Sequence, residues 1–196
     1  MIASDDSLKR EGFFLECATI AWCGVEAGLS IWSGIAAGSI LLIGFGSDSA
    51  IEIFAGLVVI WQLCGAGEQR ERRALRLIAL TFFLLAAYVL AESIRDLTLR
   101  LEAKPSIVGI GVTAAACVIM PLLARGKRRV GRKLGNAVLM ADSKESSFCA
   151  LLSGCTLLGL LLNTTLNWWW ADPATAIAVA LLAAKEGWET WEKGRG

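Results

Sequence analysis

Six apolar stretches, each close to the length that crosses a bilayer, constrain this chain more than any other feature. A helix that spans the hydrocarbon core needs about 20 mostly apolar residues. The stretches lie at approximately 13–33, 37–63, 74–97, 105–124, 143–166 and 173–190. Hydrophobic residues make up 56% of the chain, more than in an ordinary soluble domain. The sequence therefore predicts an all-α, polytopic membrane protein, in which residues 1–196 form a single six-helix transmembrane domain without a soluble domain.

The distribution of basic residues predicts which helix ends face the cytoplasm. Lys and Arg concentrate in four regions, 9–10, 70–76, 125–133 and 185–195. With six spans, these regions are the N-terminus, the second and fourth loops and the C-terminus, so they share one side. The positive-inside rule makes that side cytoplasmic. We expect an integral membrane protein of a prokaryotic inner (plasma) membrane, with both termini in the cytoplasm.

Charge and cysteine usage exclude several classes of function. The formal net charge is only +1, and the basic residues flank apolar segments, so a nucleic-acid partner is not expected. The 6 cysteines include no CxxC pair, which argues against a disulfide framework or a zinc finger. No nucleophile, base and orienting residue form a believable catalytic set, so we expect neither an enzyme nor a prosthetic group.

Two acidic residues inside the second apolar stretch are the strongest functional signal. Asp48 and Glu52 are spaced i, i+4, which places both side chains on one helix face, one turn apart. Two carboxylates on one face repel each other unless a cation or a proton lies between them, and charged residues inside a bilayer are costly. This pair therefore predicts cation or proton binding, with structural hydrogen bonding as the alternative.

The start of the fifth apolar stretch carries a second, weaker pair. Glu145 and Cys149 are also spaced i, i+4, so a helix would present both as metal ligands on one face. Charges at a helix start are commonly interfacial and a membrane cysteine commonly packs, so the spacing alone leaves both interpretations open. Asp142, one turn before Glu145, either guides ions from the cytoplasm or caps the helix.

Two further acids are candidates for a secondary or proton-relay role. Glu26 follows an apolar run in the first stretch, deep enough to face the interior of a helix bundle. Glu92 lies near the outer end of the third stretch, where it could pair with Arg95 at i+3. Structural hydrogen bonding is the alternative for each.

Four motifs, in their order along the chain, resemble those of the cation diffusion facilitator family. The resemblance rests on Asp48 to Glu52, Glu92-Ser93-Ile94, Ala141-Asp142 leading into Glu145 to Cys149, and Trp-Trp-Trp-Ala-Asp-Pro at 168–173. It implies a homodimeric antiporter that exchanges divalent metal for protons. It also implies a tetrahedral transport site with two ligands each from the second and fifth spans, which here are Asp48, Glu52, Glu145 and Cys149.

The chain departs from the family pattern at two points. The fifth-span pair is usually His and Asp, whereas Glu and Cys occupy these positions here and the chain contains no His. The cytoplasmic domain that follows the sixth span in the family is also missing, so we expect a short form whose dimer contacts come from the membrane region. A thiolate ligand shifts the preference toward zinc, cobalt or other borderline ions and away from magnesium and calcium. Zinc is the first expectation, with cobalt, iron or manganese as alternatives.

A site of Asp, Glu, Glu and Cys predicts coupling to protons. When empty it would hold several negative charges, so at least one proton should stay bound until a divalent ion displaces it. The expected function is therefore efflux of a divalent metal, first of all Zn²⁺, from the cytoplasm by metal/proton antiport.

Two alternatives from other classes remain at this point. In the first, the acids are structural and the protein is a non-transporting membrane interaction protein assembled through glycine-bearing faces with Gly44, Gly46 and Gly56. In the second, the same carboxylates line a channel for protons or monovalent cations.

Overall fold

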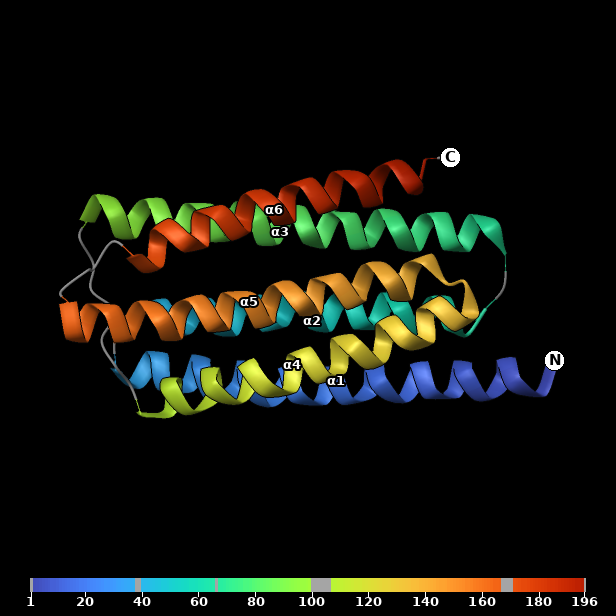
Figure 1. The fold of residues 1–196 in the computed structure, drawn as a ribbon, viewed down its shortest axis with the longest axis horizontal. Helices are drawn as coiled ribbons and strands as arrows, with labels where there is room; N and C mark the ends of the chain where they lie inside the picture. Colours follow the sequence, from blue (N-terminus) through green and yellow to red (C-terminus); the bar gives the residue numbers. More distant parts are fainter. Residues whose placement is uncertain (1, 38–39, 66, 100–106, 167–170, 196) are drawn as a thin grey trace.

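Six α-helices account for the part of the chain that the computed structural model describes, residues 2–37, 40–65, 67–99, 107–166 and 171–195. In order they are α1 (Ile2–Ala37), α2 (Ile40–Leu63), α3 (Glu68–Leu99), α4 (Ile107–Leu134), α5 (Ala137–Leu166) and α6 (Ala171–Lys193). The helices run along a common direction, and both chain ends lie at the same end of the bundle (Figure 1). The predicted all-α class with six helices is confirmed. Residues 168–170 of the tryptophan motif lie outside the described residues.

Most helices extend beyond the apolar stretches that predicted them. α1 begins at Ile2 instead of residue 13, and α4 continues to Leu134, ten residues past 124. α5 begins at Ala137 and not at residue 143. The backbone hydrogen bonds of a helix do not depend on side-chain polarity, so polar and basic residues prolong the helices past the apolar segment.

A two-residue turn separates α4 from α5, and its residues explain why the helices end and begin there. Gly135 has φ of 62°, the left-handed conformation that ends many helices, and the Asn136 N–H donates to the Gly131 carbonyl at 2.9 Å. The Asn136 side chain then accepts a hydrogen bond from the Leu139 N–H at 2.9 Å, which caps the first turn of α5. Its amide also donates to Gln62 at the end of α2, at 2.8 Å.

Two glycines on α2 allow α1 to approach closely. A Cβ atom at Gly46 would lie 2.6 Å from Ile31 Cγ1 and 3.1 Å from the Ala27 carbonyl oxygen of α1. A Cβ atom at Gly56 would lie 3.0 Å from Ile20 Cγ1, also on α1. Both glycines therefore pack within the chain, and the surroundings of Gly44 lie outside the described residues.

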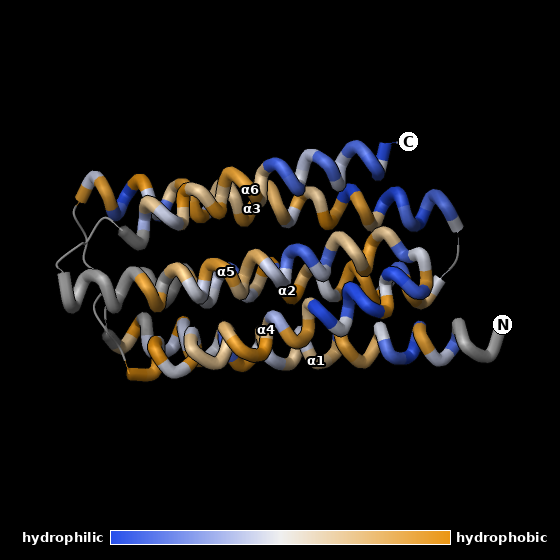
Figure 2. The backbone as a smooth tube through the Cα atoms, in the orientation of Figure 1, coloured by the Kyte–Doolittle hydropathy of each residue, from blue (hydrophilic) through white to orange (hydrophobic). Residues whose placement is uncertain are grey.

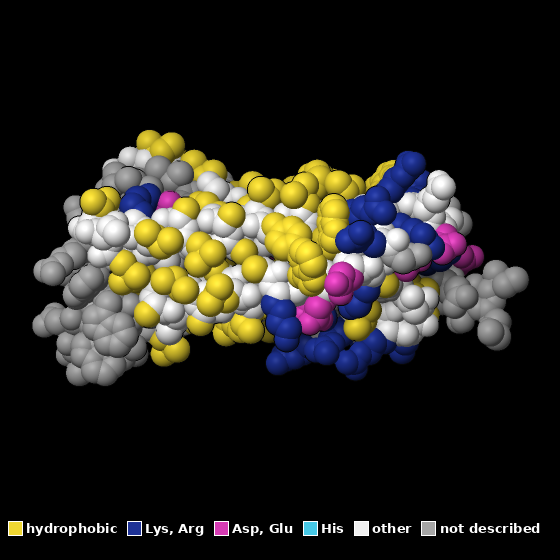
Figure 3. All heavy atoms as spheres, turned by 90° about the horizontal axis from the view of Figure 1, so that it is seen from above, with side chains coloured by type: hydrophobic (Ala, Val, Ile, Leu, Met, Phe, Trp, Pro, Cys, Tyr) yellow, Lys and Arg dark blue, Asp and Glu magenta, His cyan; other side chains and the backbone are white. Residues whose placement is uncertain are grey.

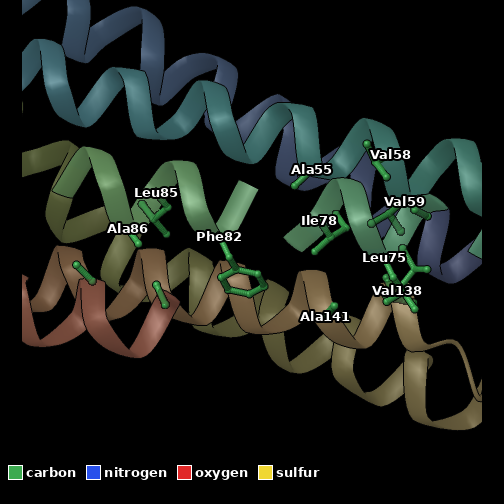
Figure 4. Packing of buried hydrophobic residues seen from close by; sticks show 14 of the residues in the cluster. Ala55, Val58, Val59, Leu75, Ile78, Phe82, Leu85, Ala86, Val138 and Ala141 are labelled. Carbon is green, nitrogen blue, oxygen red and sulfur yellow. The ribbon is translucent and has the colours of Figure 1, made fainter. Parts of the chain in front are cut away.

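The main apolar core lies where α2, α3, α5 and α6 meet (Figure 4). Phe82 of α3 is fully buried, and its ring meets that of Phe148 of α5 edge-on, with centroids 5.8 Å apart. Val59 of α2 and Ala183 of α6 belong to the same cluster. This core fixes α5 beside α2 and α3, which places the polar face of α5 next to the acidic face of α2.

The polar residues gather at the end of the bundle that holds the chain ends (Figure 2). On the face seen in Figure 3, apolar side chains cover a broad zone, and Lys and Arg side chains collect beside it toward that same end. Large apolar side chains such as Phe14, Leu84 and Leu122 are exposed around the bundle, as expected for a surface that faces lipid. Judged on the described residues, four helices, α1 to α4, are long and apolar enough to cross a membrane.

Candidate cation site

The acidic pair on α2 faces the interior of the bundle. Asp48 and Glu52 have relative exposures of only 8% and 3%, although they carry charge in an apolar helix. One turn of helix separates them, so their charges act on each other. Buried carboxylates of this kind need a proton, a cation or strong hydrogen-bond donors as partners.

Two thiols, from α5 and α1, lie beside this pair. The Cys149 thiol of α5 is buried and within hydrogen-bonding reach of the carboxylates of both Asp48 and Glu52. The Cys23 thiol of α1 donates to Glu52 Oε2 at 3.5 Å. The Ser146 side chain of α5 lies within hydrogen-bonding reach of Glu52. No role for Cys23 was predicted from the sequence, because only the tertiary structure brings it next to the α2 pair.

Glu145 of α5 is also buried, but its hydrogen-bond partner lies on α3 and not on α2. Its Oε2 atom accepts a hydrogen bond from the Thr81 hydroxyl of α3 at 3.0 Å, and its Oε1 atom has no hydrogen-bond partner among the described residues. The structure thus brings Asp48, Glu52 and Cys149 together, and turns Glu145 toward α3. Within the described chain, no three His, Cys, Asp or Glu side chains already surround a common point in a geometry that would hold a metal ion.

Glu26 lies close to the α2 pair without being part of it. This residue of α1 is fully buried, and its charge interacts with those of Glu52 and Asp48. It follows Cys23 by three residues, so both face the same side of α1. The expected orientation toward the bundle interior is confirmed.

Asp142 is not a helix cap, contrary to one of the two roles considered for it. It lies inside α5, five residues after the start at Ala137, and Asn136 supplies the cap. The Asp142 side chain is fully buried and binds Lys127 of α4, with Oδ2 and Nζ 2.5 Å apart. Lys127 also pairs with Glu16 of α1 at 3.0 Å.

Glu16 and Lys127 were not predicted as functional residues from the sequence. Glu16 carries a usable signal, because a charged residue follows Phe13-Phe14-Leu15 inside an apolar stretch. Lys127 carries none, since it lies among basic residues that were assigned to a solvated loop.

Glu92 pairs with Arg95 as predicted. Glu92 Oε2 lies 2.8 Å from Arg95 Nη2, on the same helix and three residues apart. Arg95 also contacts Asp96 at 3.1 Å, so one guanidinium group pairs with two carboxylates near the end of α3. This arrangement accounts for Glu92 without a bound ion.

A comparison with protein families gives a match to the second half of the chain and part of the first. Residues 75–194 match the sequence profile of the cation efflux transmembrane domain. The matched region runs from the first turns of α3 to the end of α6 and contains Glu145 and Cys149, whereas Asp48 and Glu52 precede it. A search of curated proteins finds no match to the chain.

Proposed function

We propose, from the premise that this chain belongs to the cation efflux family, that Asp48, Glu52 and Cys149 form the core of its transport site for a divalent cation. The family carries divalent cations across membranes, and the chain is an integral membrane cation transporter of this kind. Glu145 is the fourth ligand in this proposal and has to turn away from Thr81 to reach the ion. The site lies between α2 and α5.

One observation carries this proposal: a thiol from α5 lies within hydrogen-bonding reach of two buried carboxylates from α2. A divalent cation that replaced the thiol and carboxyl protons would be held by oxygen and sulfur ligands from two helices. Sulfur among the ligands favours zinc over magnesium, which prefers an all-oxygen shell. Zn²⁺ is therefore the proposed substrate, followed by cobalt, iron or manganese.

Proton exchange follows from the charges of the same residues. With no metal bound, buried carboxylates as close as Asp48 and Glu52 keep at least one proton between them. The arriving metal displaces that proton, and a proton returns when the metal leaves. Metal and protons thus alternate at one site, which is the requirement for antiport. We further propose a homodimer with both termini in the cytoplasm.

Transport into proteoliposomes tests this proposal. The purified chain should move Zn²⁺ against an imposed proton gradient, and Asp48→Asn should lower the initial rate by at least about tenfold, since losing a charged ligand costs more than about 1.4 kcal/mol. Asp6→Asn, which alters an exposed carboxylate near the start of α1, serves as the matched control. Unchanged transport in Asp48→Asn would contradict the site, and absence of Zn²⁺ flux in the parent would contradict zinc as substrate.

A further inference from the structure

A second buried charge cluster lies where α1, α4 and α5 meet. The Lys127 ammonium of α4 lies 3.0 Å from Glu16 Oε2 of α1 and 2.5 Å from Asp142 Oδ2 of α5. It also donates to the Ser146 hydroxyl at 3.2 Å. All four residues have a relative exposure of 0%. A lysine without access to solvent is rare unless it is paired, so this cluster needs a physical explanation.

The cluster holds fewer positive charges than negative ones. One ammonium faces two carboxyl groups and contacts one oxygen atom of each. Glu16 Oε1 and Asp142 Oδ1 are also buried and have no hydrogen-bond partner in the described part of the chain. Each acid therefore retains an oxygen atom that Lys127 does not occupy, and these oxygen atoms are potential ligands for a cation.

The cluster lies between the polar end of the bundle and the α2 pair. Asp142 precedes Cys149 by seven residues on α5, which corresponds to about 10 Å along the helix. Asp142 is also nearer than Cys149 to the turn at Gly135, which lies at the end of the bundle that holds both termini. Ser146 lies between the two sites, because it accepts a hydrogen bond from Lys127 and is within hydrogen-bonding reach of Glu52.

We propose that Glu16 and Asp142 form an access site for a divalent cation, which Lys127 occupies as a tethered cation until the ion displaces it. This inference rests on the proposed function, since the ion that passes is the one bound by Asp48 and Glu52. A divalent ion between Glu16 and Asp142 neutralises both carboxylates, and the flexible lysine stem lets the ammonium move toward the polar end. When the ion moves on to the α2 pair, Lys127 returns and closes the path behind it.

Zn²⁺ binding to variants that lack the Asp48 and Glu52 carboxylates tests this inference independently of the transport site. The full chain with Asp48→Asn and Glu52→Gln serves as background, and Lys127→Met is added to it. Calorimetric titration with Zn²⁺ should show one ion per chain in the triple variant, and binding at least about tenfold weaker in the background. Adding Glu16→Gln to the triple variant should remove that binding. Lys133→Met, which alters an exposed lysine of α4, is the matched control and should leave the background unchanged.

The outcomes separate this inference from the proposed function. A folded triple variant that binds no Zn²⁺, or whose binding survives Glu16→Gln, overturns the access site and leaves the α2 site untouched. Loss of flux in Asp48→Asn tests only the α2 site.

A second variant keeps the test decisive if neutral substitutions at Lys127 unfold the protein. Lys127→Arg retains the charge, but a guanidinium pairs with carboxylates through two parallel hydrogen bonds and is harder to displace. The apparent KM for Zn²⁺ transport should then rise several-fold. A KM equal to that of the parent would show that Lys127 is a structural ion-pair partner only.

Discussion

In the proposed transport site, Cys149 adds a sulfur ligand to the acidic pair of α2. The pair alone could bind protons or any small cation, because carboxylates are ligands for all of them. The buried thiol next to both carboxylates adds a ligand that distinguishes zinc from magnesium. Metal preference in this chain should therefore depend on a single sulfur atom of α5.

Replacing that sulfur by oxygen should change the preference. We expect Cys149→Ser to weaken Zn²⁺ transport, seen as a higher apparent KM, by about tenfold, or about 1.4 kcal/mol. Mn²⁺ transport should change much less, since manganese prefers oxygen ligands. Competition between the two ions in proteoliposomes measures the ratio, and Cys64→Ser, at an exposed thiol, is the control. Equal losses for both ions would show that Cys149 does not set the preference.

Glu145 can be tested by separating its charge from its hydrogen bond to Thr81. In Glu145→Gln, the amide oxygen still accepts from the Thr81 hydroxyl, so the melting temperature should stay close to that of the parent. If Glu145 binds the ion, Zn²⁺ affinity should fall by about tenfold.

The companion variant is Thr81→Val, which removes the hydrogen bond and keeps the charge. It leaves a buried acceptor without its donor and should lower the free energy of unfolding by about 1–3 kcal/mol. Unaltered Zn²⁺ affinity in Glu145→Gln would assign Glu145 to structure alone.

At the scale of elements, the close contact between α1 and α2 decides which side chains reach the site. Cys23 and Glu26 of α1 come near Asp48 and Glu52 because Gly46 and Gly56 of α2 have no side chain between the two helices. The glycines that suggested an assembly face thus serve packing within one chain. The geometry of the site therefore depends on residues that take no part in its chemistry.

Gly46→Val should disrupt this contact. The added Cβ would lie 2.6 Å from a side-chain atom of Ile31 and near backbone atoms of α1, which cannot move without shifting the helix. Overpacking of this kind costs about 1–3 kcal/mol, so the melting temperature in detergent should fall, and transport should fall with it. Gly24→Ala is the control, since a Cβ there meets no atom within 4 Å. An unchanged melting temperature in Gly46→Val would argue against the α1–α2 packing.

At the scale of the whole molecule, one polar end of the bundle holds the start of α1, the end of α2, the start of α3, the turn at Gly135–Asn136 and the end of α6 (Figure 1). Many basic side chains collect at that end as well (Figure 3). The positive-inside rule predicts that this end faces the cytoplasm. In that orientation the proposed access site at Glu16 and Asp142 would lie on the cytoplasmic side of the α2 pair, which fits the proposed efflux.

Cys64 is a natural probe of this orientation. It is exposed at the end of α2, next to the turn that leads to α3. A membrane-impermeant maleimide should label it in inverted vesicles and leave it unlabelled in right-side-out vesicles, with Cys64→Ser as the negative control. The reverse pattern of labelling would place the termini outside.

Much of the fold was predictable because apolar length is a local property of the sequence. Each of the six helices covers most of one apolar stretch, and the i, i+4 spacing alone put Asp48 and Glu52 on one face. The helix ends were less predictable, since α4 and α5 extend through polar residues to a turn set by Gly135 and Asn136. The pairing of Glu92 with Arg95 was also predictable from the sequence, because both residues lie on one helix.

The sequence by itself determined what could lie in the membrane: six helices, an acidic pair on the second, and the residue types available as ligands. Only the tertiary structure decided which side chains meet. It brought Cys23 and Cys149 to the α2 carboxylates, turned Glu145 to Thr81, and buried Lys127 between Glu16 and Asp142. The physical reason is that spacing fixes neighbours on one helix, whereas contacts between helices depend on how their packed surfaces rotate against one another.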